Sequence, residues 1–209
     1  MCIRDSICAA GWAIPPFIIF GGKVLISSWY TGLPREWIIE TSANSWTTNE
    51  LGVRWLKHFD AHTKDRTVGA YRLLIVDGHE SHSSYEFHKY CKEHNIVTLC
   101  MPPHSSHLLQ PLDVGCFAPL KRAYYTELDS WVRSAITQIK KETFLPAFRI
   151  AFNKAITKEN ILAGFRGAGL VPHDPERVLS KLDVVGALHT DTSTTTGYPL
   201  GVKNASYAH

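Results

Sequence analysis

Short runs of consecutive apolar residues alternate along the chain with segments whose apolar residues recur every three to four positions. Residues 73–76 (LLIV) and 96–100 (IVTLC) are mostly apolar runs of strand length. Such a run without alternation is typical of a strand covered on both faces. Between them, residues 84–94 place their apolar side chains on one side of a predicted helix. A strand, a helix and a second strand over this distance predict a parallel crossover.

The first part of the chain predicts two more strands. Residues 7–8 end one strand, and residues 13–20 (AIPPFIIF) form the next after a turn at 9–11. Because Pro15 and Pro16 interrupt the apolar stretch, it does not form the continuous helix of a signal peptide. No apolar run approaches the length of about 20 residues that is needed to span a bilayer. The segment that follows is rich in Ser, Thr and Trp over residues 27–47, which predicts an irregular loop.

The remainder of the chain is mainly helical by the same criteria. Residues 48–59 form a predicted helix with Thr48 as its cap. After a loop over residues 101–110, helical segments are expected from about Pro111 to residue 139 and from residue 158 to 165. Four apolar residues spaced four apart predict a buried helix stripe, namely Phe144, Phe148, Phe152 and Ile156.

Composition and charge exclude few classes of protein or partner. Of the 209 residues, 44% are hydrophobic and 20% are charged, which is typical of a folded soluble domain. The net charge of +3 permits a polyanionic partner without demanding one. Five cysteines without regular spacing do not form a disulfide pattern, and they favour a reducing compartment.

Two carboxylates flank the predicted crossover. Asp77 stands at the carboxyl end of the strand 73–76, where open α/β sheets place functional groups. Asp113 begins a predicted helix beyond the next strand, 113 − 77 = 36 positions later. If the two meet at one rim, they form a hard oxygen site for Mg²⁺ or Mn²⁺. Two such ions, roughly 3.5–4 Å apart, support in-line attack on a phosphodiester.

Spacing alone leaves a simpler alternative open for both carboxylates. The pair Asp77-Gly78 is a common turn sequence, and Asp113 would then be a helix-start carboxylate that meets the helix dipole.

Several histidines lie near the two carboxylates. A zinc site is one interpretation, with ligands drawn from His79, His82, Cys91, Cys100, His104 and His107. Zinc sites prefer regularly paired ligands, and the cysteines do not pair. We therefore favour a supporting role in which His79 and His107 form hydrogen bonds near the acids and orient them.

Basic and aromatic residues offer candidate contacts to nucleic acid. Lys121 and Arg122 follow Asp113 and are positioned to meet phosphates, although a solvated helix face explains them equally well. Trp29, Trp37 and Trp46 occur in the predicted loop region. If exposed, they can stack on bases, and the alternative is that they anchor the loop in the core.

Four stretches of the chain resemble a known family: CAAGWAIPPFIIFGG, LLIVDGHESH, MPPHSSHLLQPLDVGCFAPLKRAY and GFRGAGLVPHDPERVLSKL. They resemble the DDE superfamily endonuclease domain of pogo/mariner-type transposases, especially fungal ones, over residues 7–183. The resemblance implies an α/β, RNase H-like fold in which helices flank a mixed sheet. It also implies three acidic residues that hold Mg²⁺ or Mn²⁺ and cut and join DNA. By position, Asp77 matches the second acid and Asp113 the third.

The same resemblance implies the partners and the setting. The expected partner is DNA, both transposon ends and target, with room for a homo-oligomer and no membrane association. The expected location is the nucleus.

The chain departs from the family at its start. The first acid belongs on the first strand of the fold, ahead of the CAAGWAIPPF stretch, so we expect that strand to be missing. Asp5 is a poor substitute because only two positions separate it from Cys8. We divide the chain into an unmatched start (1–6), a truncated endonuclease domain (7–185) and a flexible tail (186–209).

Two functions follow from this departure. The chain is either a metal-dependent endonuclease and strand-transfer domain that is inactive by itself, or a degenerate or domesticated remnant that binds DNA or protein without cutting.

Overall fold

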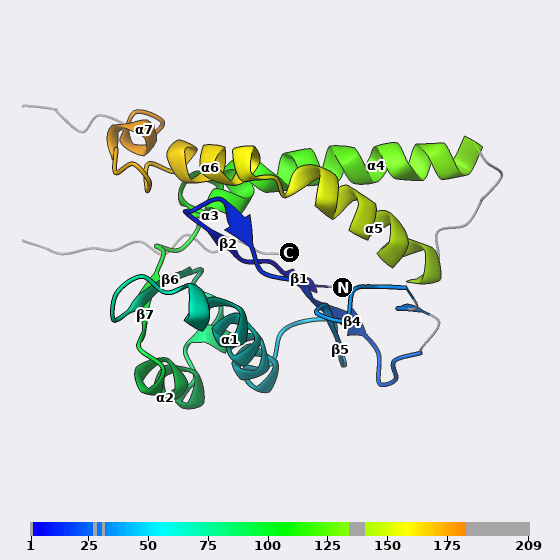
Figure 1. Cartoon of the computed structure of the whole chain (residues 1–209), viewed down its shortest axis with the longest axis horizontal. Helices are drawn as coiled ribbons and strands as arrows, with labels where there is room; N and C mark the ends of the chain where they lie inside the picture. The colour runs from blue at the N-terminus through cyan, green and yellow to red at the C-terminus, as the bar shows by residue number, and fades with distance from the viewer. Residues whose placement is uncertain (1, 27–28, 31, 134–140, 183–209) are drawn as a thin grey trace, which may run out of the picture.

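A computed structural model describes residues 2–26, 29–30, 32–133 and 141–182 of the chain. Strands occupy the centre and helices lie on two sides of them (Figure 1). The expected tail, 186–209, lies outside the described residues, as do residues 134–139 of the helix predicted up to residue 139.

The first sheet is mixed and has three strands in the order β1-β4-β5. Strand β1 (Cys2–Arg4) runs antiparallel to β4 (Phe17–Gly21), and β5 (Ile38–Ser42) runs parallel to β4. The predicted turn is formed by a separate small hairpin of β2 (Ile7–Cys8) and β3 (Trp12–Ala13). Strand β5 falls within the segment predicted as irregular loop. That prediction was wrong because pairing with the buried β4 outweighs the loop-like composition around the short IIETS segment.

The second sheet confirms the predicted crossover. Strand β6 (Arg72–Val76) pairs in parallel with β7 (Ile96–Cys100), and α2 (Tyr85–Glu93) connects them. Among the described residues, no strand pairing joins this sheet to the first one. Two short 3₁₀ turns lie on either side of β6 along the chain, η2 (Lys64–Arg66) before it and η3 (Glu80–His82) between it and α2.

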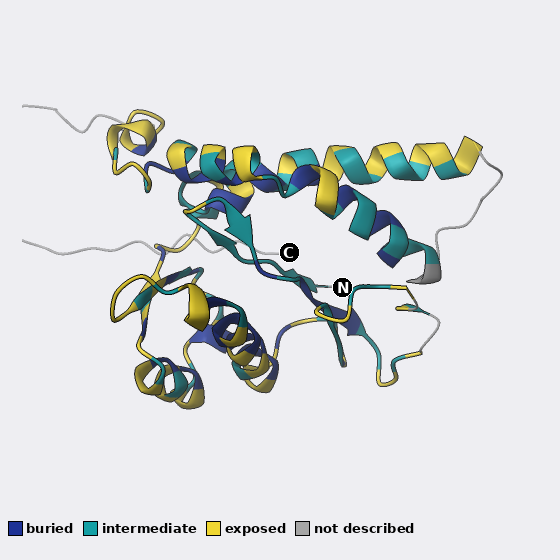
Figure 2. Cartoon of the chain, viewed as in Figure 1, coloured by how far each residue is buried: buried dark blue, intermediate teal, exposed yellow. Residues whose placement is uncertain are grey.

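One apolar core lies under both sheets and is built on α1 (Asn49–Thr63). The helix begins where predicted, because the Thr48 hydroxyl accepts a hydrogen bond from Leu51 N at 3.2 Å. Its side chains meet β4 from the first sheet and β6 from the second; the cluster includes Phe17, Ile19, Trp55, Leu56, Leu74, Val76 and Phe87. Buried residues therefore concentrate along β4 and on the inner side of α1 (Figure 2).

Two long helices cover the opposite face of the first sheet. They are α4 (Phe117–Arg133) and α5 (Lys141–Ala155), which pack side by side over it (Figure 1). The predicted stripe of α5 is confirmed in part: Phe148 is buried, and Phe144 and Phe152 pack against the same cluster.

The remaining helices gather around the hairpin. The short α3 (Ser106–Leu109) follows β7, and a π-helical segment, η4 (Leu112–Cys116), leads into α4. Helix α6 (Lys158–Gly167) crosses η4, and α7 (Glu176–Leu179) follows it. The core of this region lies between η4, α6 and the hairpin.

The expectation that both faces of the second sheet are covered was wrong. Leu74 and Val76 are buried, but Leu73 is 61% exposed and Leu99 is 51% exposed. The register pairs Leu73 with Val97, so these side chains share one face of the sheet. Helices α1 and α2 supply the cover of the other face only. The two apolar runs thus form the strands β6 and β7, and one face of their sheet remains open to solvent.

Two glycines set the crossing of η4 and α6. A Cβ atom at Gly164 would overlap the carbonyl oxygen of Pro111, and one at Gly115 would overlap the backbone of Gly164. The segment that carries Asp113 therefore reaches its position only because both residues lack a side chain.

We expect Gly164→Ala to lower the free energy of unfolding by about 1–3 kcal/mol, because overlap with backbone atoms cannot be relieved by a rotamer change. Helix propensity alone would favour alanine by about 1 kcal/mol, so destabilisation shows that the overlap dominates. Chemical denaturation measures the change. Gly78→Ala is the matched control, because no atom lies within 4 Å of its added Cβ. Equal stability of the two variants would contradict the tight crossing.

Candidate functional site

Asp77 follows β6 at the end of the second sheet, and its side chain is 46% exposed. Its Oδ1 atom accepts a hydrogen bond from the backbone N–H of His79 at 3.3 Å, and His82 Nε2 lies 3.3 Å from the same oxygen. The hydrogen bond with His82 is the main cause that lowers the pKa of Asp77 to about 2, against partial burial, which raises it. Asp77 is therefore ionised at neutral pH.

Arg4 connects β1 to this carboxylate through His82. Its two Nη atoms lie 3.2 Å from His82 Nε2, and one of them also donates to Ser81 Oγ at 3.1 Å. Arg4 Nε donates to Thr47 Oγ1 at 2.9 Å. A guanidinium only donates hydrogen bonds, so His82 Nε2 accepts from Arg4 or donates to Asp77, but not both at once. Burial lowers the pKa of His82, so the contact with Asp77 is a hydrogen bond of a neutral ring rather than an ion pair.

Asp113 lies in η4, on the outside of the molecule. Partial burial raises its pKa, and the negative charge of Asp77 raises it further, whereas the positive charges of Lys121 and His107 lower it. The charges of Asp77, Lys121 and His107 therefore act on the Asp113 carboxylate. Carboxylates with shifted pKa values are common at functional sites.

The other predicted residues occupy distinct places around the two acids. His79 contacts Asp77 through its backbone, while its ring lies 2.9 Å from Ser81 Oγ at Nδ1 and stacks on Trp46. His107 is exposed on α3, and both Lys121 and Arg122 are exposed on α4.

The sequence did not point to Arg4 or to the role of His82. Arg4 lies in the start of the chain, where no motif marks it, and its contact partners are 43 to 78 positions away. His82 was considered as a zinc ligand only, although its place five residues after Asp77 on a turn is a signal for a contact.

Asp5 has an unusual environment. It follows β1, and its Oδ1 atom is buried without a hydrogen-bond partner. Burial raises its pKa to about 7. The neighbour that its charge affects is the thiol of Cys116, in the same π-helical segment as Asp113. Asp5 thus faces η4.

The donors fit a divalent cation in kind but fall short in number. Carboxylate oxygens are the ligands that Mg²⁺ and Mn²⁺ prefer, and Asp77 and Asp113 supply them. Within the described ranges, no group of three or more His, Cys, Asp or Glu side chains is arranged to hold a metal ion. The zinc interpretation gains no support either, because Cys91 is buried in the apolar core.

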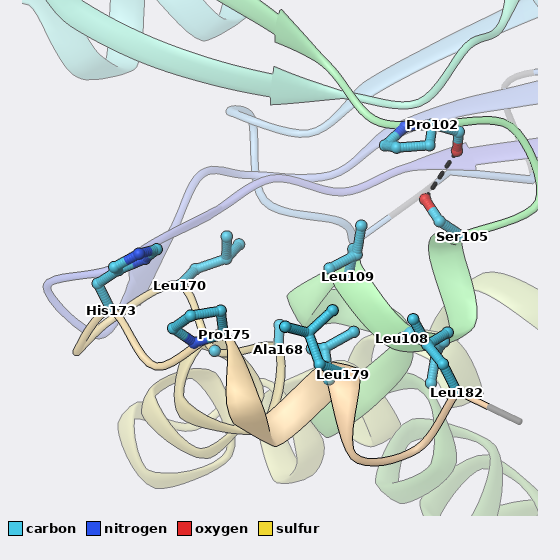
Figure 3. A pocket seen from close by; sticks show the side chains of 12 residues that line it. Pro102, Ser105, Leu108, Leu109, Ala168, Leu170, His173, Pro175, Leu179 and Leu182 are labelled. Carbon is cyan, nitrogen blue, oxygen red and sulfur yellow. Dashed lines mark hydrogen bonds between the residues drawn. The ribbon is translucent and has the colours of Figure 1, made fainter. Parts of the chain in front are cut away.

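A cavity of about 400 Å³ lies between α3 and the segment that runs from α6 to α7. Figure 3 shows leucines from both sides, among them Leu108, Leu109 and Leu179, and a hydrogen bond from Ser105 Oγ to Pro102 O of 2.7 Å. No carboxylate lines this cavity. It is an apolar space and not part of the acidic site.

The sequence profile of the DDE superfamily endonuclease matches residues 3–165. The chain belongs to this family. Membership implies an RNase H-like fold, and proteins of the family generally use divalent metal and act on DNA. No solved structure matches the chain.

Two curated fungal relatives are similar to parts of the chain. The "MFS-type transporter clz9" of Cochliobolus lunatus is 58% identical over 181 residues, which are 86% of this chain and 20% of the relative. The "Chaetoglobosin A biosynthesis cluster protein C" of Chaetomium globosum is 55% identical over 71 residues, 34% of this chain and 17% of the relative. The chain spans about a fifth or less of the length of these relatives. Among the described residues, none of the helices is both long and apolar enough to cross a membrane.

We expect His82→Ala to raise the pKa of Asp77 from about 2 towards the usual aspartate value, because the hydrogen bond that stabilises its ionised form is lost. NMR titration of the carboxyl carbon measures this pKa. His107→Ala is the control: it removes a positive charge near Asp113 and should raise the pKa of Asp113 alone. An unchanged Asp77 titration in His82→Ala would refute the hydrogen bond as the cause.

Proposed function

We propose that this chain is the catalytic domain of a metal-dependent transposase that cleaves and joins DNA strands. The proposal is supported by the match to the DDE endonuclease family and by Asp77, an ionised carboxylate at the end of β6 whose charge acts on Asp113. Asp77 and Asp113 are the ligands of Mg²⁺ or Mn²⁺. A bound divalent cation supplies a Lewis acid for the phosphoryl group and lowers the pKa of water.

The residues of the chain have separate tasks in this proposal. Asp77 is ionised at neutral pH and offers a ready anionic ligand. Asp113, whose pKa is raised by partial burial, would supply the second carboxylate ligand. His82 and the backbone of His79 hold the Asp77 carboxylate in place. Lys121 and Arg122 bind phosphates of the DNA on the exposed side of α4.

Catalysis requires a third carboxylate beyond this pair. Two metal ions repel each other, and enough anionic ligands must surround them to hold both. The described sheets are separate, with β1 at an edge of one and β6 at an edge of the other. We propose that a further strand, placed between these edges, joins them and carries the first acid of the family.

A second function has its own support. In a degenerate or domesticated remnant, the domain binds DNA or protein without cutting it. The positive charge of Arg4 near Asp77 favours this alternative, because it already compensates part of the negative charge of the carboxylate. In either case, we propose that the protein acts in the nucleus, with DNA as its partner and as a homo-oligomer if it cleaves.

We expect that the 209-residue chain does not nick DNA that carries the ends of its own element, with Mg²⁺ or with Mn²⁺, because its two acids cannot hold two ions. The same chain extended by a strand bearing an acid should nick, and Asp77→Asn should abolish that activity. A gel-based nicking assay measures both. Cleavage by the 209-residue chain that disappears in Asp77→Asn would show that a third ligand lies within it, and Asp5 would be the candidate.

DNA binding should respond to the basic residues of α4. We expect Lys121→Ala and Arg122→Ala to weaken binding to all DNA sequences alike, and each to reduce the slope of log K against log salt by about 0.9, since each releases one counterion fewer. Fluorescence anisotropy at several salt concentrations measures the slope. Lys92→Ala, on the exposed side of α2, is the control and should change nothing. If the slope of log K against log salt is the same in all three variants, α4 does not form part of the DNA-binding surface.

A further inference from the structure

Trp46 stands apart from the other tryptophans of the chain. All six lie within the described residues, and Trp46 is the exposed one, at 64%. Trp29 and Trp37 pack against the core under α5, and Trp55 is buried between the two sheets. Their positions are explained by packing. The exposed indole of Trp46 gains little free energy from burial, so core packing does not explain its position.

The backbone on both sides of Trp46 is fixed. Its N–H donates to Asn44 Oδ1 at 3.1 Å, in a turn in which Ser45 has a φ of 67°. The next residue, Thr47, is buried and accepts from Arg4, and Thr48 caps α1. The residues on both sides of the Trp46 side chain are thus held by hydrogen bonds.

The indole lies at the edge of the acidic site. Its ring is nearly parallel to that of His79, at an interplanar angle of 13° and a centroid distance of 6.5 Å. This is an offset stack at the long end of the usual range. His79 is in turn fixed by Ser81, and its backbone N–H is bonded to the carboxylate of Asp77. One side of the indole therefore faces His79, and most of the remaining surface faces solvent.

We propose that Trp46 is a nucleobase-stacking subsite at the edge of the acidic site, which binds an unpaired base of the DNA. Every base offers a flat aromatic face, so such a platform accepts any sequence. A base can stack on the indole only after it leaves the duplex, and the subsite thus selects DNA whose strands are parted near the scissile bond. This inference rests on the proposed DNA function and adds a preference for unpaired ends that phosphate contacts alone do not provide.

The test compares two DNA probes without divalent metal, so that it is independent of cleavage. One probe is a duplex with a short unpaired overhang, and the other is the same duplex with blunt ends. Fluorescence anisotropy measures both affinities for the 209-residue chain. A third probe carries abasic residues in the overhang, which keeps its phosphates and removes the bases.

We expect the chain to bind the overhang about tenfold more tightly than the blunt duplex, and to bind the abasic overhang like the blunt duplex. Trp46→Ala should abolish this preference without changing the affinity for blunt DNA, and Trp46→Phe should retain most of it. The fluorescence of 2-aminopurine in the overhang should be quenched by the wild-type chain and not by Trp46→Ala.

Tyr71→Ala is the matched control, because Tyr71 is an equally exposed aromatic residue at the opposite end of β6 from Asp77. It should keep the full preference. If Trp46→Ala keeps the preference, or if the abasic overhang binds as tightly as the normal one, the subsite is refuted while the DNA function stands. If the chain binds none of the three probes, both the stacking subsite and the proposed DNA function are overturned.

Discussion

The structure depends on the apolar contact between α1 and two sheets that share no strand pairing within the described part of the chain. Trp55, Leu56 and Phe59 of α1 lie in one core with Phe17 of β4 and Leu74 of β6. In a continuous sheet, backbone hydrogen bonds fix the relative position of the strands. Here the side chains of one helix perform that task, supplemented by Arg4, which reaches from β1 to Ser81 and His82 beyond β6. The position of Asp77 relative to the first sheet is set by these side-chain contacts.

The sequence predicted those parts of the fold that local patterns determine. The capped helix after Thr48, the strand–helix–strand crossover and the α5 stripe all follow from apolar periodicity and from residues next to one another in the chain. Strand β5 was missed because its identity depends on pairing with β4 about 20 positions earlier. The exposed face of the second sheet was missed for a related reason: an apolar run reports strand formation, but which neighbours cover the strand is a property of the whole fold.

The candidate site likewise contains residues that the sequence predicted and residues that it did not. Asp77 could be chosen because a strand end is visible in the sequence, and Asp113 because it begins a predicted helix beyond the next strand; the resemblance to the endonuclease family then matched both to catalytic acids. One partner that lowers the pKa of Asp77 comes from a distant segment: Arg4 lies in the first strand and contacts His82 beside Asp77. No spacing rule joins residues that meet only after three separate elements have packed. Motif reasoning therefore finds the acids more readily than the environment that sets their pKa values.

The charges around Asp77 bear on whether the domain holds metal and cleaves DNA or only binds a partner. A metal ion at Asp77 would share its surroundings with the guanidinium of Arg4, whose positive charge already stabilises the ionised carboxylate. The two cations compete for one anion, so metal affinity depends on further negative charge nearby. Asp113 supplies part of it, and partial burial, which raises its pKa, makes its ionised form less stable in the absence of a cation. An additional acid on a strand between β1 and β6 would add that charge. It would also replace side-chain contacts with backbone pairing between the sheets, so that the completion of the sheet and of the metal site would be one event.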